Sequence, residues 1–265
     1  LQHFEAPGVT REQLLRVHVE DYLDFLERIV PETGYRKIDM DTLMNPKTLN
    51  AAAYAAGSVV MAVDKVVSGQ VKNAYCAVRP PGHHATSDTA MGFCFYNNVA
   101  IAAAHAVEEY DLERVAIIDF DVHHGNGTDE IFENEPRVQL FSLFEADLYP
   151  LERGKEPSGD GVYIPLTAGS GSEALRTAVE STWLPALELF KPQLVLVSAG
   201  FDAHVQDDMS SLAFTDADFE WLTQLCLDVA ERHAGGRLVS LLEGGYDLDS
   251  LARCAAQHVK LMAKL

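Results

Sequence analysis

The sequence predicts an α/β fold in which helices cover both faces of a central, mostly parallel β-sheet. Three strongly apolar segments, which begin near residues 116, 193 and 237, alternate with segments of helical periodicity. Continuous apolar runs are typical of strands that are buried on both faces of a sheet. Polar clusters follow the predicted strands at residues 79–84, 119–126, 199–202 and 243–246. Ligands of such sheets collect at the carboxyl ends of the strands, so we expect these clusters to form one site.

The first 110 residues are predicted to be mainly helical. Thr10 is a candidate N-cap, and the apolar pattern from residue 14 to residue 29 indicates a helix broken near His18, for which we expect a structural role. A Pro-Pro-Gly brace stands directly before His83 and His84, so their placement is expected to matter. The other elements expected here are a loop at 38–50, a buried helix at 49–67, a strand at 73–78 and a helix at 98–110.

The rest of the chain continues the alternation of strands and helices. A long polar loop is expected at 144–161, and loops of this length in compact domains are usually functional or mobile. The remaining expected strands are 138–143, 162–166, 193–198 and 237–242, and the remaining helices are 128–132, 172–190 with Pro185 inside it, 215–232 and 248–265.

The stretch of residues 116–127 carries the clearest chemistry. It begins as an apolar strand, and Asp119, Asp121 and His123 are expected on one face because strand side chains alternate. Buried charges are costly unless they are paired or bound to metal. Together with Asp202, which follows the apolar strand expected at 193–198, Asp121 and His123 offer three ligands and an open fourth position. This set suits Zn²⁺, with Fe²⁺ or Co²⁺ also possible, and such a metal activates water and polarises a carbonyl.

Proton transfer is assigned to the paired histidines. His83 and His84 are candidate acid/base groups, and Asp119 and Asn126 are candidate partners for their second ring nitrogens. Tyr246 follows two glycines and is either a hydrogen-bond donor to a developing oxyanion or a packed aromatic at the rim.

The composition excludes some functions. The 40 acidic residues outnumber the 20 basic ones and give a formal charge of −20, which argues against direct binding of nucleic acid. The charge is compatible with cationic substrates such as lysine-rich tails or polyamines, or with solubility alone. The four cysteines form no C-x-x-C pair, and no segment has membrane-spanning length or signal-peptide character. A cytoplasmic enzyme is therefore expected.

Taken together, these motifs resemble those of the histone deacetylase superfamily, specifically its class II-like bacterial deacetylases and histone deacetylase-like amidohydrolases. The matching segments are 79–85, 91–98, 119–128, 198–203 and 242–246. The resemblance implies a three-layer arginase/deacetylase fold and one catalytic domain over residues 1–265, which lacks the N-terminal strand of the family. It also implies zinc-dependent hydrolysis of N-acetyl amides, above all N-acetyl-lysine in proteins or peptides.

The resemblance also assigns roles to residues. Asp121, His123 and Asp202 match the zinc ligands, and metal-bound water is expected to attack the carbonyl. The catalytic group comprises His84 as general acid/base with Asn126, His83 with Asp119, and Tyr246 as the residue that polarises the carbonyl. One potassium ion is expected at Asp119, Asp121, His123, Ser142 and Leu143, and a second at Phe132, Glu135 and Val138. The substrate-binding set comprises Phe93 and Tyr149 as tunnel walls, Gly92, Gly82 and Gly244 lining the tunnel, and Asp41 and Met209 at the rim.

Two departures from the family pattern affect the expected substrate. Phe144 stands where a His is common, and Met209 stands where polyamine-selective members have Glu. The alternatives are a deacetylase of acetylpolyamines or other small N-acyl amines, an arginase-type ureohydrolase, which needs two metals, and a non-catalytic acyl-lysine binder. The sequence leaves the oligomeric state open.

Overall fold

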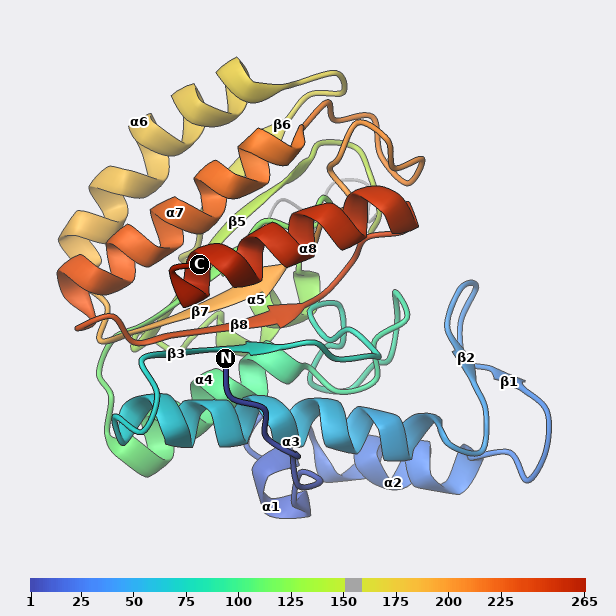
Figure 1. Ribbon diagram of the computed structural model, residues 1–265. Helices are drawn as coiled ribbons and strands as arrows, with labels where there is room; N and C mark the ends of the chain where they lie inside the picture. Colours follow the sequence, from blue (N-terminus) through green and yellow to red (C-terminus); the bar gives the residue numbers. More distant parts are fainter. Residues whose placement is uncertain (151–158) are drawn as a thin grey trace.

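Six parallel strands form the centre of the computed structural model, which describes residues 1–150 and 159–265 (Figure 1). The order of the strands across the sheet is β3-β8-β7-β4-β5-β6, and every neighbouring pair runs in parallel. The strands are β3 Asn73–Cys76, β4 Val115–Asp119, β5 Val138–Glu145, β6 Val162–Leu166, β7 Leu194–Ala199 and β8 Leu238–Leu242. The predicted α/β fold with a mainly parallel sheet is confirmed.

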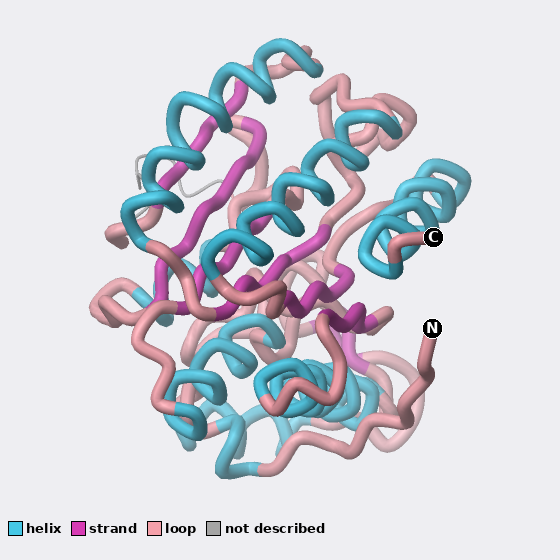
Figure 2. The backbone as a smooth tube through the Cα atoms, turned by 60° about the vertical axis from the view of Figure 1, so that its left-hand side comes forward, coloured by secondary structure: helices cyan, strands magenta, loops and turns pink. Residues whose placement is uncertain are grey.

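Helices cover both faces of this sheet, as Figures 1 and 2 show. On one face lie α3 Thr48–Val67 and α4 Asn98–Tyr110, with α1 Arg11–Leu14 and α2 Glu20–Ile29 packed outside them. On the other face lie α6 Ser172–Phe190, α7 Asp216–His233 and α8 Leu248–Ala263. The short helix α5 Asn126–Phe132 leads from the polar cluster after β4 toward β5. None of the described helices combines the length and the apolar character that a membrane span requires.

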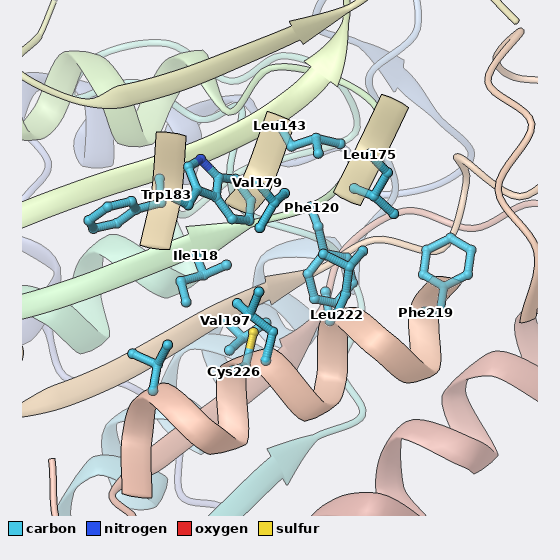
Figure 3. Packing of buried hydrophobic residues seen from close by; sticks show 14 of the residues in the cluster. Ile118, Phe120, Leu143, Leu175, Val179, Trp183, Val197, Phe219, Leu222 and Cys226 are labelled. Atoms are coloured by element: carbon cyan, nitrogen blue, oxygen red, sulfur yellow. The ribbon is translucent and has the colours of Figure 1, made fainter. Parts of the chain in front are cut away.

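The alternation of side chains along β4 divides the core into two layers. Val115 and Ile117 pack toward α3 and α4, whereas Ala116 and Ile118 pack toward the opposite helices. Every residue of β4 and β7 is buried, which explains why these strands read as continuous apolar runs. Figure 3 shows the second layer, where Trp183 of α6 fills the space beside the sheet.

The first helical segment is interrupted where the sequence indicated. Thr10 and Gln13 form a capping box at α1, and the chain leaves helical conformation between Leu14 and Glu20. His18 lies buried in this break. Its Nδ1 is 3.0 Å from the carbonyl oxygen of Thr86, and its Nε2 accepts a hydrogen bond from the backbone N–H of Asn97 (3.0 Å). The ring therefore ties the N-terminal segment to residues 86–97.

One expectation about β4 was wrong. The strand ends at Asp119, so Asp121 and His123 do not share a strand face with it. The carboxylate of Asp119 accepts the N–H of Asp121 (3.1 Å), and that of Asp121 accepts the N–H of His123 (3.0 Å). Such local bonds compete with the strand ladder and turn the backbone. The three side chains still converge, but through two consecutive turns.

Two predicted loops differ from the structure. Within residues 38–50 the chain forms part of an antiparallel hairpin of β1 Arg36–Lys37 and β2 Leu43–Met44, and α3 already begins at Thr48. The hairpin projects on the side toward which the arrows of β7 and β8 point (Figure 1). Of the loop predicted at 144–161, the first two residues continue β5, and residues 151–158 lie outside the described part of the chain.

Candidate active site

The polar clusters after the central strands meet at the carboxyl edge of the sheet. Asp121 and His123 follow β4, Asp202 follows β7, and one ligand atom from each of the three lies within 4.8 Å of the others. All three residues are buried. Nδ1 of His123 is 3.0 Å from Oδ1 of Asp121 and 3.2 Å from Oδ2 of Asp202. The structure thus brings together the three residues that the sequence nominated as metal ligands.

The charges of this cluster fit a divalent cation. Burial lowers the pKa of His123, but the two carboxylates beside its ring, those of Asp121 and Asp202, outweigh burial and raise the pKa to about 10. Burial and the charge of Asp121 raise the pKa of Asp202 to about 6. A proton on His123 therefore balances the buried carboxylates, and a metal ion held by the same three residues would replace that proton.

The packing around the cluster also fits a bound ion. Among the described residues, Asp202 Oδ2 is one of three buried side-chain atoms without a hydrogen-bond partner, and its nearest charged neighbour on His123 is Nδ1, at 3.2 Å. Glycines allow the backbone to approach the carboxylates closely. A Cβ atom at Gly244 would lie 2.1 Å from Asp202 Oδ2, and one at Gly200 would lie 2.1 Å from Asp121 Oδ2. A side chain at either position would therefore displace a ligand.

His83 and His84 lie beside the cluster with their rings 4.0 Å apart. Nδ1 of His83 is 3.0 Å from Asp119 Oδ2, and Nδ1 of His84 is 2.8 Å from Asn126 Oδ1. The structure thus pairs each histidine with the partner that the sequence suggested. An amide oxygen at Nδ1 requires a proton there, which leaves Nε2 of neutral His84 free to accept one.

The surroundings drive the two pKa values apart. Burial would lower the pKa of His83, but the carboxylates around it, that of Asp119 above all, raise the pKa well above its usual value. Burial and then the charges of His83 and His123 lower the pKa of His84 well below its usual value. Neighbouring groups with opposite shifts are the usual arrangement of an acid/base site.

Tyr246 approaches the cluster from the loop after β8. Burial and then the charges of Asp121 and Asp202 raise the pKa of its hydroxyl, so the group stays protonated and can donate a hydrogen bond. The residue is 38% exposed, and its ring lies 6.1 Å from that of Phe93. Tyr246 is thus partly exposed, and it lies close enough to Asp121 and Asp202 for their charges to act on its hydroxyl.

The predicted substrate-binding residues surround the same site. The ring of Tyr149 packs edge-on against His84 at 5.0 Å. Phe93 has a φ of 65°, and its N–H donates to the hydroxyl of Thr42 (3.1 Å), which in turn donates to Asp41 (2.9 Å). Gly92 passes directly over His84, because a Cβ there would lie 2.3 Å from the imidazole.

The structure also places the predicted potassium ligands. Asp119 and Ser142 are partners across the β4–β5 ladder, and the hydroxyl of Ser142 is 3.2 Å from Nδ1 of His124. Phe132, Glu135 and Val138 line a cavity of about 420 Å³, where two consecutive turns bring their backbones together. Potassium binding at the two positions stays a prediction.

Glu243 and Asp207 are buried carboxylates that contact site residues and were given no role from the sequence. Glu243 Oε2 accepts the N–H groups of Gly82 (2.7 Å) and His83 (3.2 Å), and thereby holds the histidine loop. Asp207 Oδ2 accepts the N–H of Tyr246 (2.6 Å). An acidic residue directly after the apolar run of β8 was a visible signal for Glu243, whereas the surroundings of Asp207 gave none.

Among the described residues, one other group has the composition of a metal site: His204, Asp216 and Cys254. Arg253 already pairs with both oxygens of Asp216, at 2.9 and 3.2 Å. His204 donates from Nε2 to Asp216 (2.8 Å) and accepts at Nδ1 from the N–H of Gln206 (3.1 Å). The polar atoms are satisfied without a metal, and the group ties α7 to α8.

Comparisons with known proteins agree with this geometry. The histone deacetylase domain family matches residues 1–262. The chain is 40% identical over 253 residues to the histone deacetylase-like amidohydrolase of Pseudomonas aeruginosa. The aligned residues cover 93% of this chain and 66% of the relative. The chain is 41% identical over 276 residues to the human polyamine deacetylase HDAC10. That alignment covers 97% of this chain and 40% of the relative. The solved HDA15 HD domain superposes with a TM-score of 0.87 at 32% identity, over 99% of this chain and 77% of that one.

Proposed function

The chain belongs to the histone deacetylase family of hydrolases, and on this basis we propose that it is a zinc-dependent amidohydrolase that removes acetyl groups from N-acetyl-lysine side chains. The observation that carries the proposal is the pair of histidines with opposite pKa shifts beside three buried metal-ligand side chains. We also propose that residues 1–265 form one catalytic domain, which acts in the cytoplasm. The chain spans about two thirds of the Pseudomonas relative, so the activity of a whole protein is part of the proposal.

In this proposal Asp121, His123 and Asp202 hold the zinc ion. When bound, zinc would supply a Lewis acid that lowers the pKa of water to about 7 and polarises the amide carbonyl. Potassium at the two predicted positions would act structurally. Fe²⁺ or Co²⁺ fits the same donor set, because oxygen and imidazole ligands suit all three metals.

The residues around the metal set move the protons. His84 takes a proton from the attacking water at Nε2 and returns it to the nitrogen of the leaving amine. Asn126 keeps the second proton of His84 on Nδ1, at 2.8 Å. His83 remains charged beside Asp119 and stabilises the negative charge that develops on the substrate.

Tyr246 and the aromatic walls complete the proposed mechanism. The hydroxyl of Tyr246 is protonated and donates a hydrogen bond to the carbonyl oxygen as that oxygen becomes negative. Phe93 and Tyr149 exclude water from the extended acyl-lysine chain, and their rings lie against Tyr246 and His84. Asp41 and Met209 contribute to the rim that receives the rest of the substrate.

A second candidate is a deacetylase of acetylpolyamines. The identity to human HDAC10 and the charge of −20 favour it, since a cationic substrate is attracted by such a field. Met209 disfavours it, because a thioether provides no charge partner for a second ammonium group.

The test compares zinc-loaded protein on an acetyl-lysine peptide, a trifluoroacetyl-lysine peptide and N8-acetylspermidine, with and without a hydroxamate chelator. Chelator-sensitive turnover of the peptides is the expected result. Preference for acetylspermidine would replace the first candidate by the second. Absence of turnover on all three with zinc bound would leave a non-catalytic binder and overturn both.

A further inference from the structure

We propose that Asp207 is the positioning residue of Tyr246. The inference rests on the proposed function, because it concerns the hydroxyl that is proposed to polarise the carbonyl. Asp207 is 5% exposed, and its carboxylate accepts three backbone hydrogen bonds. Oδ2 accepts from Tyr246 (2.6 Å) and Asp247 (3.0 Å), and Oδ1 accepts from Met209 (3.0 Å).

The backbone of Tyr246 needs a hydrogen-bond partner from outside its own loop, because the two glycines before it restrict its conformation little. Two glycines precede it, and Gly245 has a φ of 137°, a conformation that side chains rarely adopt. Gly244 is fixed on the other side by its N–H bond to Asp121 (2.8 Å). Beyond Gly245, the next backbone N–H is that of Tyr246 itself, and Asp207 is its acceptor.

Few contacts of the Tyr246 side chain fix its direction. Within the described part of the chain its hydroxyl has no hydrogen-bond partner, and its ring contact is with Phe93 at 6.1 Å. The direction of the ring therefore depends on the backbone at 246. A buried carboxylate that accepts two adjacent N–H groups forms strong, directional bonds, and small displacements of a catalytic group are costly.

A role for Asp207 in stabilising α8 is separable from this one. The N-cap of α8 is Asp247, whose carboxylate accepts the N–H of Ser250 (2.8 Å). The contact of α7 with α8 through Arg253 and Asp216 is likewise independent of Asp207. Loss of the Asp207 carboxylate therefore removes its bonds to the N–H groups of Tyr246 and Asp247, whereas the bond from Ser250 to Asp247 and the contact of α7 with α8 do not involve Asp207.

The test is a double-mutant cycle on the zinc-loaded protein with an acetyl-lysine peptide. Asp207→Asn and Asp207→Ala are combined with Tyr246→Phe, and Asp208→Asn is the matched control because Asp208 is exposed. In the wild-type background we expect each Asp207 variant to lower kcat by about 10- to 100-fold with KM changed less than about 3-fold. In the Tyr246→Phe background the further loss should be below about 2-fold, since Asp207 acts through the missing hydroxyl.

Equal losses in the two backgrounds, or a change confined to KM, would overturn the proposal. If wild-type protein turns over no acetyl-lysine peptide, the proposed function fails, and the anchor is then tested by amide hydrogen exchange. At an unchanged melting temperature, Asp207→Asn should speed exchange at Tyr246 and Asp247, whereas Asp208→Asn should not. Unchanged exchange in Asp207→Asn would refute the anchor itself.

Discussion

At the scale of single residues, the site depends on two groups that must keep their protons in defined places at neutral pH. His84 is neutral and Tyr246 is protonated, and in each case burial is the largest cause. Burial thus keeps His84 as a proton acceptor and Tyr246 as a hydrogen-bond donor beside the buried carboxylates.

We expect His84→Ala and Tyr246→Phe each to reduce kcat on an acetyl-lysine peptide by at least about 100-fold, because each removes one acid/base or oxyanion contact. The measurement is steady-state turnover together with the zinc content of each variant. Near-full activity of both variants at full zinc content would contradict the assignment.

At the scale of elements, the β1–β2 hairpin contacts Phe93, a predicted wall of the substrate tunnel, through the hydroxyl of Thr42. Thr42 is fully buried and accepts the N–H of Phe93, which sits at a φ of 65° in a tight turn. A non-glycine residue in this conformation keeps it only when its surroundings hold it there.

Thr42→Val should therefore loosen the turn and raise KM for the peptide by about 3- to 10-fold with a smaller effect on kcat, since an unpaired N–H costs about 1–3 kcal/mol. Thr42→Ser keeps the acceptor and should resemble the wild type. Equal kinetics of the Val and Ser variants would show that the hydroxyl does not control Phe93.

The contact of α8 with α7 and β8 contains a pH-sensitive group. His258 is buried between the hydroxyls of Thr223 (2.7 Å) and Ser240 (2.9 Å), and burial lowers its pKa to about 4. The unfolded chain binds this proton near pH 6.5. Stability from His258 is thus complete above that pH and is lost as the pH falls toward 4.

The wild-type protein should lose unfolding free energy as the pH falls from 7 to 5, and in His258→Gln this loss should be smaller by about 2 kcal/mol. The figure follows because each unit of pKa shift corresponds to about 1.4 kcal/mol. Urea unfolding at both pH values measures this difference, with exposed His3→Gln as the control. A pH dependence identical to that of the wild type would contradict the prediction.

The sequence predicted the strands and helices around the sheet, and the grouping of the three candidate metal ligands, because apolar runs and adjacent polar residues are local signals. Asp121 and His123 were nominated correctly as neighbours, although the turns that orient them were not foreseen. Asp207 and Glu243 were missed because their hydrogen-bond partners lie 39 and 161 positions away. Such contacts depend on how β-strands are ordered in the sheet, which local patterns do not specify.

At the scale of the whole molecule, a charge of −20 should assist the capture of cationic substrates. We expect kcat/KM for a lysine-rich acetylated peptide to fall about 10-fold or more as salt increases from 0.05 to 0.5 M, because the screening length becomes shorter. An uncharged acetyl-lysine analogue is the control. Equal salt dependence of the two substrates would exclude long-range attraction.

The convergence of two strand ends on one cluster has a mechanical consequence. Asp121 and Asp202 are about 80 positions apart in the chain, yet both lie at the same edge of the sheet. An ion held between them would act as a reversible cross-link that clamps β4 to β7 and binds the folded state alone. At a free zinc concentration of 100 times Kd the clamp would add about 2.7 kcal/mol of stability, so chelation should lower the melting temperature even of a catalytically dead His84→Ala protein.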